Sequence, residues 1–91
     1  MRKQEIANQL ASDFRRPVRE IVAIIDSLSE IIKNEVSSGD GEVTIRGFGT
    51  FTKKHRAVKQ ARNISKGEAV IVPEHDIPFF RPSKDFIKKM L

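Results

Sequence analysis

The sequence contains no cysteine, no tryptophan and no tyrosine, and it has only two histidines among its 91 residues. The missing cysteines exclude disulfide bonds, and together with the scarcity of histidine they exclude the common zinc sites. A chain of this length buries only about 60% of its unfolded surface, so it usually needs a disulfide, a metal or a partner subunit for stability. Of these three, the composition leaves a partner subunit as the expected source of stability.

Long apolar segments are missing as well. No apolar run approaches the roughly 18 residues that cross a membrane, and the start of the chain, Met-Arg-Lys-Gln-Glu, lacks the apolar stretch of a signal peptide. We therefore expect a cytoplasmic protein without a membrane partner. His55 and His75 are twenty residues apart and are not accompanied by acid–base groups at a recognisable spacing. We expect neither an enzyme nor a cofactor or metal site.

The charge of the chain is unevenly distributed. The net charge is +5, but residues 1–42 hold six Lys and Arg against eight Asp and Glu, whereas residues 43–91 hold eleven against four. Within residues 53–66 there are six cations and no acid. A charge run is often only a solvated surface. An acid-free block in a chain of otherwise mixed charge nevertheless favours binding to phosphates.

Two helices are predicted in the first half of the chain. Apolar residues at four-residue spacing indicate a short amphipathic helix over residues 3–14, and Pro17 suits the first turn of a second helix over residues 18–38. The apolar positions of the second helix are Ile21, Val22, Ile24, Ile25, Leu28, Ile31, Ile32 and Val36. This stripe is too wide for one small neighbour to cover, which again predicts a second subunit.

The middle of the chain is predicted to form strands. Residues 43–45 alternate apolar and polar side chains as a half-buried strand does. Gly47-Phe48-Gly49 makes a tight reversal, and residues 50–61 continue as a second strand. Beyond Lys53 this strand is polar on both sides, so it should project into solvent and pair with a returning strand over residues 68–72.

The last part of the chain is predicted to return to the body. Pro73 and Pro78 bracket a link, and Ser83 is a plausible cap for a short final helix over residues 84–91. Four phenylalanines lie outside the basic run, next to glycine or proline turns: Phe48, Phe51, Phe79 and Phe80. We expect them to pack at a dimer core rather than to stack on bases.

Three stretches of the sequence occur in an order typical of one protein family. They are Gly47-Phe48-Gly49-Thr50-Phe51, then His55-Arg56-Ala57 with Arg62-Asn63 and Gly67, then Ile77-Pro78-Phe79-Phe80-Arg81-Pro82-Ser83-Lys84. They resemble the first turn of the sheet, the arm and the return into the last helix of the HU/integration host factor family of bacterial histone-like DNA-bending proteins. The spacings match without gaps from Gly47 to the C-terminus.

The resemblance implies an α+β fold. It consists of two N-terminal helices, a three-stranded antiparallel sheet extended into a β-hairpin arm, and a short C-terminal helix, in an intertwined dimer. The single domain, residues 1–91, would comprise a dimer body (residues 1–52 and 75–91) and a DNA-binding arm (residues 53–74). The implied partners are double-stranded DNA in the nucleoid and a second copy of the chain, with a heterodimer with a paralogue as the alternative.

The resemblance also implies which residues bind DNA. Cations of the arm would meet phosphates, residues at its tip would enter the minor groove, and residues at helix starts would lie under the flanking duplex. The predicted site comprises Lys3, Arg46, Lys53, Lys54, Arg56, Lys59, Arg62, Asn63, Ile64, Lys66 and Lys84. Because alternate residues share a strand face, Lys54 and Arg56 should point one way and Lys53 and Lys59 the other.

The sequence departs from the family pattern at three places. Ile64 stands where the arm tip usually has the proline that wedges between base pairs, and isoleucine lacks the fixed φ of proline. Ser83 replaces a glycine. Residues 15–17 read Arg-Arg-Pro where a polar helix cap is more usual.

Several functions compete at this point. The leading hypothesis is a dimer that binds duplex DNA with low sequence specificity and bends or compacts it. The alternative within the same family is a site-specific bender of the integration host factor type. Such a protein recognises its site through the deformability of the DNA rather than through a code of base contacts, so the protein sequence does not distinguish the two hypotheses. A basic RNA-binding module would require exposed aromatic residues on the sheet. A structural assembly protein would dock its basic hairpin on an acidic partner.

Overall fold

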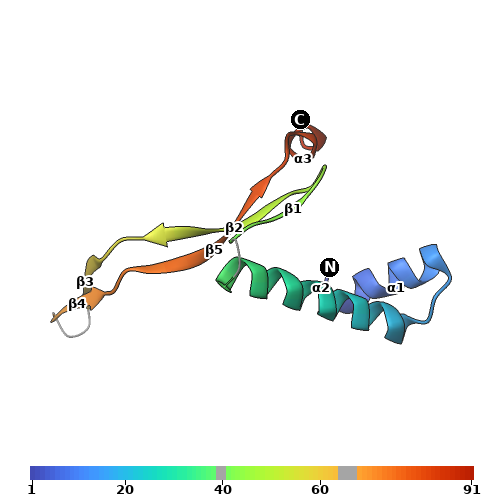
Figure 1. Cartoon of the computed structure of the whole chain (residues 1–91), viewed down its shortest axis with the longest axis horizontal. Coiled ribbons are helices and arrows are strands. Elements are labelled where there is room, and N and C mark those ends of the chain that lie inside the picture. The colour runs from blue at the N-terminus through green and yellow to red at the C-terminus, as the bar shows by residue number, and fades with distance from the viewer. Residues whose placement is uncertain (39–40, 64–67) are drawn as a thin grey trace.

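The structure is a computed structural model that describes residues 1–38, 41–63 and 68–91, with side chains described at 1–38, 41–59 and 71–91. In the described residues, two helices are followed by five strands and a final helix (Figure 1). The elements are α1 (Lys3–Phe14), α2 (Val18–Ser38), β1 (Val43–Ile45), β2 (Gly49–Arg56), β3 (Lys59–Asn63), β4 (Glu68–Val72), β5 (His75–Pro82) and α3 (Lys84–Lys89). This order confirms the predicted α+β class and both N-terminal helices.

Helices α1 and α2 form a hairpin around a small apolar cluster. Ala7 and Ala11 of α1 are buried against Ile21 of α2. Leu10, Val22 and Ile25 lie partly buried around them. Alanine at these positions lets the two helices approach closely, and it contributes little apolar area to a core. The cluster therefore joins the two helices without forming a complete core.

The turn between the helices is closed by a residue in the left-handed conformation. Arg15 has φ 54° and ψ 49°, and the backbone N–H of Arg16 donates to the carbonyl of Ala11 at 3.0 Å. This is the hydrogen bond of a Schellman motif, in which glycine is preferred at the position of Arg15 because a Cβ is strained there. The unusual Arg-Arg-Pro sequence thus places a strained residue after α1.

We expect Arg15→Gly to stabilise the protein by about 0.5–1 kcal/mol. Relief of the left-handed strain gains about 1–2 kcal/mol, and the added freedom of the unfolded chain costs about 0.4–1 kcal/mol. Urea denaturation at fixed protein concentration measures the difference. Arg15→Ala is the control because it removes the charge but keeps the Cβ. Equal stabilisation by both variants would contradict the explanation that the Cβ of Arg15 is strained in the left-handed conformation.

Strands β1, β2 and β5 form an antiparallel sheet with β2 in the centre. In its register Phe51 lies opposite both Val43 on β1 and Phe80 on β5. The segment after His75 is thus an eight-residue strand, whereas the sequence predicted a link between Pro73 and Pro78. Pro78 is compatible with β5 because β5 is an edge strand among the described residues, so its missing N–H breaks no ladder.

The long second strand predicted over residues 50–61 is interrupted. Hydrogen-bonded pairing stops after Arg56, which lies opposite His75, and resumes at Lys59, which lies opposite Val72. Two residues separate the ladders on the outgoing strand, and two separate them on the returning strand. The pairing register is therefore the same before and after the break. Pro73 lies in this break and has no N–H to donate. Strands β3 and β4 continue beyond it as a two-stranded sheet.

An aromatic cluster joins the sheet to α3. It consists of Phe48, Phe51, Phe80 and Phe86, with neighbouring ring centroids 4.9–6.2 Å apart. The N–H of Ser83 donates to the carbonyl of Phe48 at 2.9 Å. The Ser83 hydroxyl accepts from the N–H of Phe86 at 3.1 Å, which confirms the predicted cap of the last helix. Serine therefore has a structural role where the family usually has glycine.

The protomer is elongated, with principal extents of 57 × 32 × 29 Å. The arm and α1 lie at opposite ends of the long axis (Figure 1). Its radius of gyration is 18.5 Å, whereas a compact chain of this length would have about 12 Å. Its accessible surface is 7891 Å², whereas a compact monomer of this mass would expose about 5,400 Å². A single chain therefore exposes far more surface than a compact monomer of its mass would.

The uncovered surface includes one face of α2. Ile24, Leu28 and Ile31 follow helical spacing and are 55%, 47% and 59% exposed. Ile21 on the covered side is 6% exposed. The wide stripe predicted from the sequence is thus half covered by α1 and half open. An uncovered apolar face of this kind is typical of a subunit interface.

Candidate nucleic-acid interface

Three of the predicted DNA-binding cations lie on β2, at the base of the arm. Lys54 and Arg56 share one face of β2, and Lys53 lies on the other, as the alternation predicts. All three are exposed. The Lys54 ammonium lies over the ring of Phe79, 5.1 Å from its centroid, which is a cation–π contact. This contact positions Lys54 on the surface of the sheet.

Lys53 packs against the loop between α2 and β1. A Cβ built on Gly41 would lie 3.3 Å from the Cε of Lys53, and Gly41 itself has φ 87°. Glycine at position 41 therefore serves both the backbone conformation and the close approach of the lysine stem. Lys53 is oriented by the body of the protein, although it belongs to the arm by the sequence division.

The outer arm carries the remaining predicted residues. Lys59 begins β3 and is exposed. Arg62 and Asn63 lie on β3, opposite Ala69 and Glu68 of β4, and their side chains are outside the described part of the chain. Ile64 and Lys66, predicted at the tip, are likewise outside the described residues. The roles of all of these residues remain predictions from the sequence.

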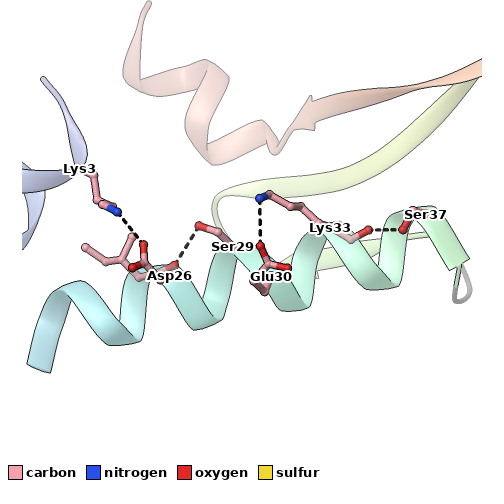
Figure 2. Close-up of polar contacts among 7 residues, drawn as sticks. Lys3, Asp26, Ser29, Glu30, Lys33 and Ser37 are labelled. Atoms are coloured by element: carbon pink, nitrogen blue, oxygen red, sulfur yellow. Dashed lines mark hydrogen bonds and ion pairs between the residues drawn. The ribbon is translucent and has the colours of Figure 1, made fainter.

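Lys3 lies at the start of α1, far along the chain from the arm. Its ammonium is 2.8 Å from the Asp26 carboxylate of α2, and both side chains are about half exposed (Figure 2). Exposed ion pairs contribute little to stability, so a phosphate can compete with Asp26 for Lys3. The structure therefore places Lys3 on the helical body with an internal partner already present.

Arg46 and Lys84 flank one junction of the fold. Arg46 lies in the reversal after β1, where Gly47 has φ 82°. Lys84 begins α3, next to Ser83, whose N–H binds Phe48 of the same reversal. Both cations are exposed. In one protomer the predicted site thus falls into three regions: the arm, this junction and the start of α1.

The arm base contains a group of residues that the sequence did not predict as functional. His55 lies directly opposite Asp76 in the β2–β5 register. Its Nδ1 is 2.8 Å from Asp76 Oδ1, and its Nε2 is 3.2 Å from Glu74 Oε2. We call His55, Glu74 and Asp76 the His55 clasp. The acid-free run of residues 53–66 thus has two carboxylates beside it, supplied by the returning chain.

The clasp shifts the ionisation of its members. The hydrogen bond to Asp76, and then that to Glu74, raise the pKa of His55 above its ordinary value. The hydrogen bond to His55, with weaker attraction from Lys53 and His75, lowers the pKa of Asp76. The contribution of protonated His55 to folding stability is lost as the pH rises through its raised pKa. That of the aspartate is lost as the pH falls through its lowered pKa. The complete clasp exists between these two limits.

Neither a transmembrane helix nor a metal-binding cluster is present in the described residues. None of their helices combines the length and the hydropathy of a membrane span. No three of their His, Cys, Asp and Glu side chains are grouped as metal ligands would be. What the site offers is a set of exposed cations on a narrow paired-strand extension. This fold and this site define a nucleic-acid-binding protein.

Comparison with known proteins identifies the family. The model of the family described as bacterial DNA-binding protein matches residues 1–91. The chain belongs to this family, the HU/integration host factor family of DNA-binding nucleoid proteins, which confirms the resemblance seen in the sequence. The family is one of architectural proteins, and dimer formation is typical of it.

Individual relatives agree with this assignment. DNA-binding protein HRL53 of Rhizobium leguminosarum is 30% identical over 84 residues, which cover 92% of this chain and 91% of the relative. Integration host factor subunit beta of Marinobacter nauticus is 33% identical over 86 residues, covering 93% and 87%. The Anabaena HU–DNA cocrystal structure matches with a TM-score of 0.92 and 31% identity, covering 99% of this chain and 97% of that one.

Proposed function

We propose that this chain forms a homodimer that binds duplex DNA with low sequence specificity and bends or compacts it, as a non-enzymatic protein of the cytoplasmic nucleoid. The observation that carries the proposal is the pair of strands β3 and β4, which continues beyond the β2–β5 ladder and extends away from the helices (Figure 1). A narrow ribbon with exposed cations at its base suits the grooves and phosphates of a duplex. The likeness to the HU–DNA cocrystal structure supports the same function.

The dimer is supported by the surface that one chain leaves open. The excess of about 2,500 Å² over a compact monomer is of the size that obligate dimer interfaces bury. A groove of about 710 Å³ lies between the end of α2 and the sheet, lined by Ile32, Val36, Phe51 and Phe80 among others. We propose that a second copy fills this groove and covers the open face of α2. Sedimentation of a folded monomer at micromolar concentration would contradict this.

A mobility-shift series tests the binding mode. The substrates are linear, nicked and four-way-junction DNA of unrelated sequences, each titrated at several salt concentrations. We expect similar affinities for all sequences and a steep loss of affinity with salt, because released counterions drive the binding. Salt-insensitive binding, or none, would contradict the proposal and favour docking on an acidic protein.

A site-specific bender is the second candidate. It is favoured by the 33% identity with integration host factor subunit beta of Marinobacter nauticus. For this candidate, a heterodimer with a paralogue is the alternative assembly. A large preference for one sequence in the same series would support this candidate. Stable folding of the chain by itself as a dimer would speak against the need for a paralogue.

The arm tip provides a separate prediction, based on the sequence. We expect Ile64→Ala to reduce DNA bending more than affinity, because an apolar wedge unstacks base pairs whereas phosphate contacts supply most of the binding. Ile64→Pro should sharpen the bend, since its fixed φ pre-organises the wedge. Energy transfer between the ends of labelled short duplexes at saturation measures the bend. Equal transfer for the wild type and both variants would show that residue 64 does not intercalate.

A further inference from the structure

The His55 clasp has a geometry that requires a protonated histidine. Both ring nitrogens face carboxylate oxygens, at 2.8 Å from Asp76 and 3.2 Å from Glu74. An ionised carboxylate can only accept hydrogen bonds, so each nitrogen must carry a hydrogen to bind both. The arrangement is therefore that of the imidazolium ion. A neutral imidazole would leave one nitrogen lone pair facing a carboxylate.

The clasp also lies where the arm leaves the sheet. The pair of His55 and Asp76 is the last but one of the β2–β5 ladder. Glu74 belongs to the two-residue break that separates this ladder from that of β3 and β4. Hydrogen-bonded pairing is interrupted at this level of the arm, and Pro73 has no N–H to offer. The side chain of His55 thus binds the returning chain on both sides of the point where the arm begins.

We propose that protonated His55 is a positioning residue, which fixes the base of the arm so that affinity for duplex DNA increases as the pH falls through neutrality. The inference rests on the proposed DNA-binding function. The imidazolium holds the returning chain through both carboxylates. Because the arm is then already ordered in the free protein, DNA binding costs less conformational entropy. Loss of the proton removes one of the two hydrogen bonds of His55. It also leaves the carboxylates of Glu74 and Asp76 without a compensating charge from His55, and in the complex these carboxylates would repel the nearby phosphates.

The surrounding charges do not replace this proton. From β2, Lys53 acts on Asp76, and from β5, His75 does the same. His75 itself is hydrogen-bonded through Nδ1 to the carbonyl of Pro73 at 2.8 Å. From α2, Lys33 lines the same groove as Asp76, and its ammonium is paired with Glu30 at 3.1 Å. Among the described residues, His55 is the group that bridges the two carboxylates of the clasp.

DNA and protons should favour each other's binding. A phosphate backbone near His55 stabilises the imidazolium, and by linkage protonation must strengthen DNA binding by the same factor. The gain in affinity equals the factor by which DNA binding strengthens proton binding to His55, and we expect it to be about three- to tenfold per arm. Both ring nitrogens are within hydrogen-bonding distance of their partners while the side chain is 59% exposed, so a proton can exchange without unfolding.

The sequence offers a well-controlled test, because His55 and His75 are its only histidines. Fluorescence anisotropy at low salt measures the affinity for a labelled duplex from pH 6 to pH 8. The wild type and His75→Gln should bind about three- to tenfold more weakly per arm at pH 8 than at pH 6. His55→Gln should bind weakly at both pH values, and His55→Arg, with a permanent charge, should bind tightly at both.

Nuclear magnetic resonance of the His55 ring gives a second, independent readout on the wild type. The pKa of His55 should be higher in the DNA complex than in the free protein. An identical pH dependence for the wild type and His55→Gln, or an unchanged His55 pKa in the complex, would overturn this inference while leaving DNA binding intact. Absence of DNA binding by all variants, the wild type included, would instead overturn the proposed function.

Discussion

Reversal of two arm charges, Arg56→Glu with Lys59→Glu, is expected to weaken binding to duplex DNA by about two orders of magnitude or more. Both side chains are exposed on the paired strands of the arm, and a dimer carries each of them twice. Four phosphate contacts would be lost, so the slope of log affinity against log salt should fall by about four. Anisotropy titrations at three or more salt concentrations measure both quantities.

Thermal stability should hardly change in this double variant, because exposed charges contribute little to folding. The matched control is Arg19→Glu with Lys88→Glu, which changes the net charge equally at exposed positions of α2 and α3. The control should lose much less affinity, through long-range electrostatics alone. Equal losses in the two double variants would show that the arm has no special role in binding.

The second large effect is expected in the aromatic cluster, from Phe80→Ala. The Phe80 ring contacts Phe51 at 4.9 Å and Phe48 at 5.0 Å between centroids. Its removal should destabilise the protein by about 3–5 kcal/mol, which is a large part of the stability of a small domain. The melting temperature should fall by at least about 12 °C, or the protein should not fold. Circular dichroism at fixed protein concentration measures the change.

Gly49→Ala tests the same contact from the opposite side. A Cβ at residue 49 would lie 2.5 Å from the Phe80 ring and 2.6 Å from the carbonyl of Arg81. Backbone and ring cannot both move away, so this single methyl group should also destabilise the fold. Phe80→Leu is the milder control because it keeps most of the apolar volume. Stability close to the wild type for both Phe80→Ala and Gly49→Ala would contradict the central role of the ring.

The helices could be predicted from the sequence because their signals are local. Four-residue apolar spacing and Pro17 place α1 and α2, and Ser83 marks the start of α3. The strand β5 was not predicted, because two prolines argued for a link. Its pairing depends on β2, whose paired residues lie 19 to 33 residues upstream, and on an edge position where Pro78 breaks no ladder. Edge position is a property of the whole sheet and cannot be read locally.

In the candidate site, too, residues with a local sequence signal could be predicted, whereas residues brought together by strand pairing could not. The cations of the arm could be found in the sequence because they are consecutive or nearly so. The His55 clasp was missed because its carboxylates lie about twenty residues downstream and reach His55 only through the antiparallel register. A strand prediction for residues 75–82 would have placed Asp76 opposite His55. The missing signal was therefore the pairing of strands, not the chemistry of the residues.

The break between the two ladders of the arm limits how the arm can change in length. Arg56 is paired with His75 and Lys59 with Val72, so equal numbers of residues separate the ladders on the two strands. Insertion of one residue into one strand alone would turn every later side chain to the opposite face and move Lys59 away from its present orientation. The paired strands of the arm can therefore be lengthened or shortened only by matched changes on both sides, and relatives in which these strands are longer or shorter should differ from this chain there by even numbers of residues.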